Sequence, residues 1–403
     1  MKKNTDDPKT KRKIKRAANG DGSIYQRKDG RWCAAVTIGY SNNGTQIRKS
    51  IYDKDREQLR AKLLALQNDI IINGGYVRDD VITLEQWGKK YLNDFIKNTV
   101  RPTTFDSYDT ICRNHIFNDK IAKMKLKEIK AYHLQPYINK KNELSKSYIK
   151  KIYLLLNKFF DGAVKNDLIP KNPMQGINLP RSTKEVKDIE ILTLEQQKAY
   201  IQATEQSSYR PLLLTALFTG MRIGEILALT WDKVDLKAMQ IKVNASLKET
   251  RIHENGETRW ETIIQSPKTK QGIRTIPISK ILANVLQDHK VAQSELALSI
   301  GRAEFNKDRY VFCSEVGTPL SARNVQRAHY QTCMRANITQ VGFHALRHTF
   351  ATRMIENGVD VKTVQAWIGH STIQMTYNIY VHVQEQSKKA AAHVQDDLFA
   401  SLF

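Results

Sequence analysis

Short alternating runs of apolar and polar residues, separated by turn sequences, lie near the start of the chain. Alternation with a period of two places every second side chain on one face, which is the pattern of a half-buried strand. An Asp-Gly pair and an Asn-Asn-Gly sequence separate the runs, and both favour tight hairpin turns. The predicted strands are residues 22–26, 32–40 and 46–52.

The pattern then changes to helical spacing. Between residues 55 and 72, apolar residues recur at three- and four-residue steps, as they do on one face of a helix. The pair Gly74-Gly75 ends this periodicity. We therefore expect residues 20–78 to form one small domain of three strands and one helix.

Helical spacing dominates the next hundred residues. Thr83 precedes an apolar-periodic run and is a candidate N-cap. Further helices are predicted at residues 105–115, 127–142 and 146–166. The last of these has aliphatic and aromatic residues on one side and lysines over most of the remaining surface. We predict an all-α bundle over residues 82–175.

A proline-containing stretch without periodicity separates the bundle from a mixed region. We assign residues 176–192 to an interdomain linker. Beyond it, helices are expected near residues 194–205 and 211–218, a β-hairpin within 240–278, and more helices toward the C-terminus. Residues 193–403 should form one mainly α-helical domain with a small sheet. The fold class is therefore multidomain α+β.

The composition adds a strong positive charge. Lys and Arg number 64 against 41 Asp and Glu, a formal net charge of +23. Residues 1–80 carry +8, residues 81–185 carry +10, and residues 186–403 carry only +5. The front half should therefore supply most contacts to a polyanion, for which nucleic acid is the commonest candidate. A merely soluble basic surface is the alternative. The Lys-rich residues 1–19 are expected to form a flexible leader.

Cysteine usage and hydropathy restrict the class of protein. The four cysteines are far apart and form neither a CxxC motif nor a metal-like cluster, which suits buried thiols in a reducing compartment. The N-terminus lacks the apolar run of a signal peptide, and no run approaches the roughly 18 apolar residues that span a membrane. We expect a cytoplasmic protein with access to DNA and no membrane partner.

Two stretches within residues 193–403 contain basic residues that are candidates for a functional site. In TGMRIGE, Arg222 and Glu225 stand three residues apart at the start of a predicted helix. They form either a surface ion pair or a site in which the guanidinium holds an anion. Residues 266–278 are predicted to form a hairpin with Lys268 at the entrance to its turn. A lysine there either reaches a phosphate or is simply solvated.

Histidines follow in two more stretches. In HALRH, His344 and Arg347 fall on one face of a helix, and His370 follows in Ile-Gly-His. Each histidine taken alone is consistent with a structural role. A zinc site built from His344 and His370 with His348 and His382 is a weaker hypothesis, because the spacings match no zinc pattern and no cysteine lies nearby in sequence.

Taken together, these stretches resemble the tyrosine recombinase (phage integrase) family. Arg in TGMRIGE, Lys in PKTKQG, HALRH, IGH and a tyrosine ten residues beyond that histidine occur in family order. Residues 22–72 resemble the arm-site DNA-binding domain of integrases from conjugative transposons and phages of Gram-positive bacteria. Residues 83–175 resemble the helical core-binding domain. The resemblance implies a site-specific recombinase acting on double-stranded DNA at core and arm attachment sites.

The resemblance also implies a chemical role for the motif residues. Tyr380 would attack phosphorus and form a covalent 3′-phosphotyrosyl link. Arg222 and Arg347 would hold the non-bridging oxygens, and Lys268 would protonate the leaving 5′-oxygen. No metal and no cofactor is required, because the phosphotyrosyl link conserves the energy of the broken bond.

The remaining motif residues would support this chemistry. His344 would assist proton transfer at the tyrosine, and His370 would donate a hydrogen bond to the phosphate. Glu225 would orient the site, with His344 as one route. Tyr380 is preferred to Tyr377 as nucleophile, because its distance from His370 resembles the family pattern while Tyr377 stands where an apolar residue is usual.

The resemblance further implies partners. Residues 383–403 carry an apolar stripe that would dock on a neighbouring protomer in a homotetramer on DNA, with docking on its own domain as the alternative. An excisionase and a host DNA-bending protein are expected. Integration and excision of a mobile element is the leading function. A chromosome- or plasmid-resolving recombinase and a non-catalytic DNA-binding regulator are the alternatives.

Overall fold

The computed structural model places the chain in two compact units, Met1–Val186 and Lys187–Phe403. The residues described are 23–40, 45–72, 82–185, 190–254, 257–267, 272–300, 305–339 and 341–369. The leader, the Asn42–Gly44 turn, Lys268, His370, Tyr377, Tyr380, His382 and the tail 383–403 lie outside these ranges. All four cysteines lie inside them as free thiols, and Cys33, Cys112 and Cys333 are buried.

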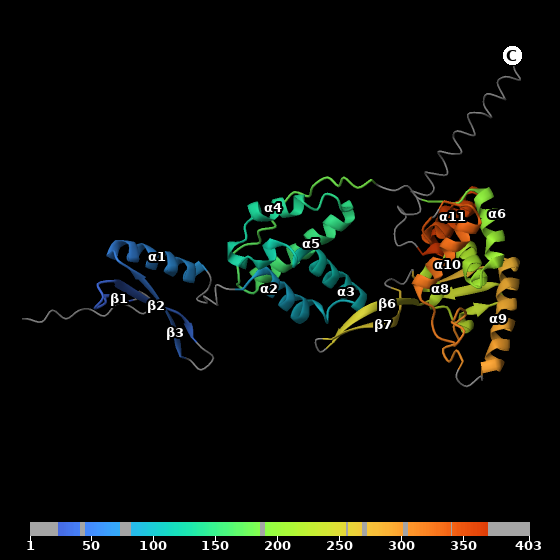
Figure 1. The fold of residues 1–403 in the computed structure, drawn as a ribbon, viewed down its shortest axis with the longest axis horizontal. Coiled ribbons are helices and arrows are strands. Elements are labelled where there is room, and N and C mark those ends of the chain that lie inside the picture. Colours follow the sequence, from blue (N-terminus) through green and yellow to red (C-terminus); the bar gives the residue numbers. More distant parts are fainter. Residues whose placement is uncertain are drawn as a thin grey trace, which may run out of the picture. The chain divides into compact units, whose positions relative to one another are not determined.

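The front of the first unit is a small sheet covered by one helix. Strands β1 (Ser23–Gln26), β2 (Trp32–Tyr40) and β3 (Gln46–Asp53) are antiparallel and lie in that order. Helix α1 (Arg56–Ile72) lies along one face of the sheet (Figure 1). Gly30 adopts a φ of 83° in the β1–β2 turn, where a side chain would be strained. The three strands and the helix are confirmed. The core consists of Ala34, Val36, Leu59 and Leu63.

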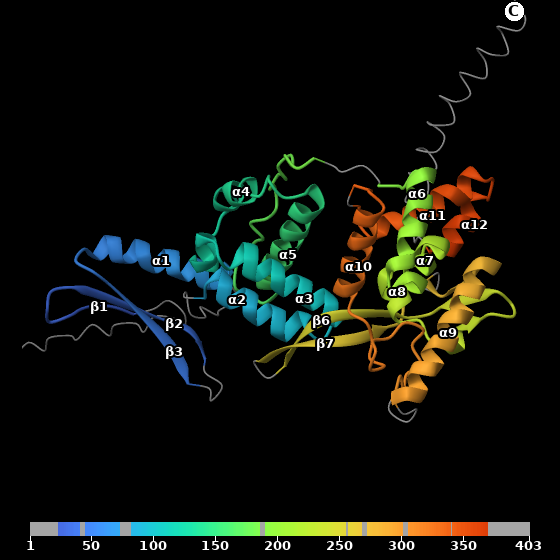
Figure 2. The same cartoon turned by 45° about the vertical axis from the view of Figure 1, so that its right-hand side comes forward.

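The rest of the first unit is a helical bundle with its own core (Figure 2). Its α-helices are α2 (Leu84–Tyr91), α3 (Pro102–Ile111), α4 (Ala131–Asn139) and α5 (Lys146–Lys165). Helices α2 and α3 each continue for five residues with π-helical bonding, η1 (Leu92–Ile96) and η2 (Cys112–Ile116). The all-α prediction is confirmed. Thr83 caps α2 as predicted, since its hydroxyl accepts from the backbone N–H of Gln86 at 3.2 Å.

Two predicted helix starts in this bundle were wrong. Helix α3 begins at Pro102, three residues early, because proline fits the first helical position, whose N–H has no partner within the helix. The 3₁₀ turn η3 (Lys120–Lys123) comes before the expected helix at 127–142, the 3₁₀ turn η4 (Leu126–Glu128) replaces the front of that helix, and α4 starts only at Ala131. Local spacing does not distinguish a 3₁₀ turn from the first turn of an α-helix.

A glycine allows α2 and α5 to approach closely. A Cβ atom at Gly162 of α5 would lie 2.2 Å from a ring carbon of Tyr91. Trp87 of α2 donates its indole N–H to the carbonyl of Phe159 at 2.7 Å. The stretch after α5 has no helix or strand, but Ile169, Met174 and Ile177 are buried in the same core. The contact therefore holds the short helix α2 against α5, the longest helix described in the bundle.

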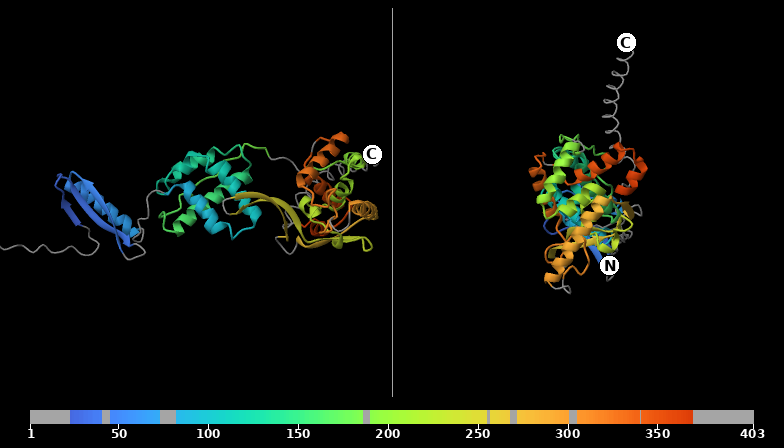
Figure 3. Two further views of the ribbon diagram at one scale, coloured as in Figure 1. Left: turned by 60° about the horizontal axis from the view of Figure 1, so that its bottom comes forward. Right: turned by 90° about the vertical axis from the view of Figure 1, so that its right-hand side faces the viewer.

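The second unit is mainly α-helical and contains two small sheets (Figure 3). Its helices are α6 (Leu194–Ala203), η5 (Thr204–Gln206), α7 (Arg210–Thr219), α8 (Ile223–Leu227), η6 (Trp231–Lys233), α9 (Lys280–Ile300), α10 (Ala322–Arg335), α11 (His344–Glu356) and α12 (Val361–Ile368). Its strands are β4 (Val234–Asp235), β5 (Gln240–Val243), β6 (Ser246–Glu254), β7 (Glu257–Gln265) and β8 (Arg274–Pro277). No helix in the described part of the chain is long and apolar enough to cross a membrane.

The pairing of these strands corrects one prediction. A hairpin exists within residues 240–278, but it is formed by β6 and β7. Strand β8 instead pairs with β5 in a sheet of order β4-β5-β8. The predicted hairpin over residues 266–278 is therefore wrong, because the strands on its two sides belong to different sheets. Alternation identifies a strand but not its partner, and so it could not separate these two arrangements.

Candidate active site

Arg347 lies on α11 with only 1% of its surface exposed. One guanidinium nitrogen, Nη1, donates to the carbonyl of Gly220 at 2.7 Å. Within the described residues, Nε and Nη2 are buried and have no hydrogen-bond partner. Burial, and next the charge of Arg222, lowers the pKa of Arg347 to about 9. A buried cation with unfilled donors is costly unless an anion completes it.

Gly220 creates the contact with Arg347 at the end of α7. It adopts a φ of 63° and caps the helix, whose last carbonyls lack partners within the helix. A Cβ atom there would lie 2.6 Å from a ring carbon of Phe350 on α11. A glycine is therefore required both by the backbone conformation and by the close approach of α7 and α11.

Arg222 is the N-cap residue of α8 and is partly exposed, with 39% of its side chain accessible. Its Nη1 donates to Glu225 Oε1 at 2.9 Å, and its backbone N–H donates to Oε2 at 2.9 Å. Its Nη2 donates to the carbonyl of Gly369 at 2.8 Å. The Arg222–Glu225 pair exists, but it is no surface pair, because Glu225 is only 8% exposed.

Arg274 is a member of this cluster that the motif analysis missed. It begins β8 and is also 8% exposed. Its Nη2 and Nη1 donate to the two oxygens of Glu225 at 2.7 and 3.1 Å. Along β8 the residues are alternately buried and exposed, with Arg274 on the same side as Ile276. An arginine at an inward-facing strand position was the sequence signal that could have revealed it.

Among the described residues, four hydrogen bonds reach the Glu225 carboxylate, and they come from Arg222 and Arg274. Burial raises the pKa of Glu225, but the hydrogen bonds and charges of Arg274 and Arg222 outweigh it, so the pKa is lowered. The carboxylate therefore orients two arginines. From the sequence, His344 was expected as one residue through which Glu225 could orient the site. The hydrogen bonds to the Glu225 carboxylate in the described part of the chain come from Arg222 and Arg274 instead.

His344 is the first residue of α11, and its ring lies 4.7 Å from that of His348, at right angles to it. The residue is exposed on one side. Burial of the ring lowers the pKa of His344 to about 4, and the charges of His348, Arg347 and Arg222 contribute to this shift. His344 is therefore neutral at pH 7. The zinc hypothesis also needs His370 and His382, which lie outside the described residues.

The described residues thus bring together four of the seven predicted site residues, Arg222, Glu225, His344 and Arg347. With Arg274, two guanidinium groups bind one carboxylate and a third, that of Arg347, is close enough to feel its charge. Three cations against one anion leave a cluster that can accept a further anion. Lys268, His370 and Tyr380 lie outside the described residues. Gly369, the neighbour of His370, is nevertheless bound by Arg222.

Comparison with known proteins finds similar sequences over most of the chain. Residues 190–387 match the phage integrase family, and residues 83–142 match the phage integrase N-terminal SAM-like domain. A tyrosine recombinase XerC-like protein of Caldanaerobacter subterraneus is 36% identical over 90% of this chain and 95% of its own length. The ICEBs1 integrase of Bacillus subtilis is 27% identical over 74% of this chain and 78% of its own.

Solved structures with the same fold include two integrases bound to DNA. A fragment of the Tn1549 transposon integrase, residues 82–397, with transposon right end DNA has a TM-score of 0.60 at 22% identity, covering 77% of this chain and 99% of the fragment. A lambda integrase tetramer on a Holliday junction has a TM-score of 0.52 at 18% identity, covering 91% and 96%. With the full-length relative, these matches place the chain in the tyrosine recombinase (phage integrase) family, enzymes that break and rejoin DNA strands.

Proposed function

We propose that this recombinase is the integrase of a mobile element and that it exchanges DNA strands through a covalent link to Tyr380. The observation that carries the proposal is the buried guanidinium of Arg347, with two unfilled donor atoms and Arg222 beside it. A phosphodiester supplies the anion that this cluster lacks. The likeness to integrases of a transposon and of ICEBs1 supports the mobile-element assignment.

The chemistry follows from the charges. The Tyr380 oxygen attacks phosphorus, the bond to the 5′-oxygen breaks, and Lys268 gives that oxygen a proton. Arg222 and Arg347 neutralise the charge that grows on the non-bridging oxygens. In the reverse step a free 5′-hydroxyl attacks the phosphotyrosyl bond, so neither a metal nor a cofactor enters.

The histidines complete the proton transfers. His344 is neutral at pH 7, which suits a residue that accepts the tyrosine proton, directly or through water. His370 donates a hydrogen bond to the phosphate. Glu225 holds Arg222 at the site through the hydrogen bonds already described.

The domain roles follow from charge and fold. Residues 20–78 bind arm sites, residues 82–175 bind the core site, residues 176–192 link them to the catalytic domain 193–403, and the tail 383–403 docks on a neighbouring protomer. The active form is a homotetramer on DNA, an arrangement that the lambda integrase adopts on a Holliday junction. An excisionase and a host bending protein set direction, and the protein acts in the cytoplasm.

A nicked suicide substrate tests the nucleophile. Wild type accumulates a covalent protein–DNA adduct, whereas Tyr380→Phe binds the site and forms none, because phenylalanine has no attacking oxygen. Tyr377→Phe is the matched control and keeps the adduct. An adduct that persists in Tyr380→Phe and disappears in Tyr377→Phe would reverse the assignment.

Resolution of DNA dimers is the second candidate, favoured by the full-length likeness to a XerC-like protein. The two functions differ in their DNA requirement. An integrase with an arm-binding domain needs the sequences that flank the core site, whereas a resolving recombinase works on two short core sites. Recombination assays with core sites alone and with flanked sites separate them.

A further inference from the structure

The guanidinium of Arg274 joins three segments of the second unit. Besides its two bonds to Glu225, it donates Nε to the carbonyl of Trp367 at 2.5 Å and Nη1 to the carbonyl of Gly272 at 3.4 Å. Its side chain is only 5% exposed. The bond to Trp367 connects β8 to the end of α12. The bond to Gly272 is made to the residue that directly follows residues 268–271 in the sequence, which include Lys268.

Arg274 also packs against Gly369, the residue that precedes His370. Gly369 ends α12 with a φ of 66°. A Cβ atom on it would lie 3.0 Å from Nη1 and 3.1 Å from Cδ and Cζ of Arg274. The Gly369 carbonyl accepts from Arg222 at 2.8 Å. Gly369 is thus held by Arg274 through packing and by Arg222 through a hydrogen bond.

Arg274 further determines how Arg222 uses its donors. Because Arg274 engages both oxygens of Glu225, the side chain of Arg222 donates to only one of them. Without Arg274, a buried carboxylate would pair with both guanidinium nitrogens of Arg222, since a two-pronged pair is the stronger geometry. Nη2 of Arg222 would then leave the carbonyl of Gly369, and the guanidinium would turn away from the position it holds beside the end of α12.

We propose that Arg274 is a positioning residue for DNA cleavage: it holds Glu225 and the end of α12, and thereby sets where Arg222 and His370 meet the scissile phosphate. Arg274 itself does not touch DNA. The inference rests on the proposed roles of Arg222 and His370, and it adds the residue that maintains their geometry.

The test is Arg274→Lys in the full-length protein. Lysine keeps the positive charge, but one ammonium cannot bridge both oxygens of Glu225 and the Trp367 carbonyl. We expect single-turnover cleavage of a suicide substrate to slow by about 100-fold, with site binding by gel shift unchanged. Arg353→Lys is the matched control, because Arg353 also donates to a backbone carbonyl, that of Leu192 at 2.6 Å, away from the cluster.

A modified substrate distinguishes positioning from loss of structure. A methylphosphonate at the scissile position has no charged non-bridging oxygen, so the arginines matter less there. The defect of Arg274→Lys should shrink at least tenfold on this substrate, as should that of Arg222→Ala. An equal defect on both substrates, or cleavage at the wild-type rate, overturns the proposal.

A second variant keeps the test decisive if Arg274→Lys does not fold. Gly369→Ala disturbs the contact between Gly369 and Arg274 by adding a methyl group next to the guanidinium, and it should give the same substrate-dependent defect. Wild-type cleavage by folded Gly369→Ala then refutes the role of this contact. Failure of the wild-type protein to form an adduct counts instead against the proposed function.

Discussion

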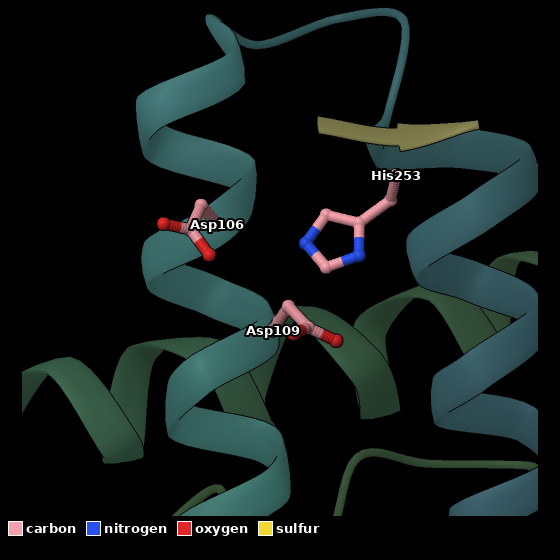
Figure 4. A group of neighbouring side chains, drawn as sticks. All are labelled: Asp106, Asp109 and His253. Carbon is pink, nitrogen blue, oxygen red and sulfur yellow. The ribbon is translucent and has the colours of Figure 1, made fainter. Parts of the chain in front are cut away.

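The helical part of the first unit, residues 82–185, keeps its charged side chains at the surface, whereas the second unit buries several. Among the described residues of the helical part, no Asp, Glu, Lys or Arg is buried. Asp106 and Asp109 stand one turn apart on α3 and are partly exposed (Figure 4), and Asp109 accepts at 2.7 Å from Arg113, which is exposed. The second unit buries Glu225, Arg274 and Arg347.

Exposed and buried charged residues therefore have different roles in this protein. Surface charges cost little to keep, and each adds a small share to DNA affinity that salt screens. Buried charges are expensive and are retained where their position matters. The region with the lower net charge, +5 over residues 186–403, therefore holds the candidate chemistry, while we expect the more basic front of the chain to supply attraction to DNA.

Arg347→Met gives the largest expected effect. It removes the proposed phosphate ligand and should slow cleavage by about 1000-fold. It also removes a buried cation with two unfilled donors, so the free energy of unfolding should rise by about 1–3 kcal/mol. Denaturant unfolding and suicide-substrate cleavage measure the two effects. A variant that is less stable and fully active would show that Arg347 is structural.

Glu225→Gln should have the next largest effect. It leaves Arg222 and Arg274 without their shared anion, and breaking a buried charge pair costs about 3–5 kcal/mol. Thermal unfolding measures the loss. The matched surface change is Glu85→Gln, which breaks an exposed pair with Lys89 and should cost less than about 0.5 kcal/mol. Equal losses at the two positions would contradict the comparison.

Acidification should destabilise the second unit before the helical part. Burial lowers the pKa values of His289, His329, His344 and His348, and in the helical part it lowers that of His115. The unfolded chain binds protons that the folded unit excludes, so the stabilisation is complete above pH about 6.5 and is lost as the pH falls through the folded pKa values.

His329 is the clearest contributor to this pH dependence. Its Nε2 lies 3.0 Å from the Val341 carbonyl and its Nδ1 lies 2.8 Å from the Tyr200 hydroxyl. A neutral ring satisfies both by donating to the carbonyl and accepting from the hydroxyl. Amide hydrogen exchange between pH 7.5 and 5 should show α10 and α11 losing protection before α2 and α5. Simultaneous loss would contradict the expectation.

The smallest effects are expected on the lysine face of α5. Lys146, Lys150 and Lys151 are exposed, and each change to Gln should reduce the salt dependence of site binding by about one unit of log–log slope. Cleavage at saturating DNA should not change. Binding titrations at several salt concentrations measure this, and a cleavage defect at saturation would place α5 in the chemistry.

Sequence patterns predicted the elements whose own residues determine them. The strands of residues 23–53 follow from alternation and turn glycines, and α5 follows from its apolar face. The motifs also singled out Arg222, Glu225, His344 and Arg347 before any geometry was known. Local residue types and spacings carry all of this, because each such element is stabilised by neighbours along the chain.

Tertiary structure alone decided the contacts between distant segments. The pairing of β8 with β5 joins residues 31 to 37 positions apart. The contact of Arg347 with Gly220 and the contacts of Arg274 with Glu225 and Trp367 join residues 49 to 127 positions apart. A one-dimensional pattern states that a residue faces inward but not what it meets there. The anion-accepting character of the cluster arises at that level, because packing excludes water from guanidinium groups whose charge the sequence had already supplied.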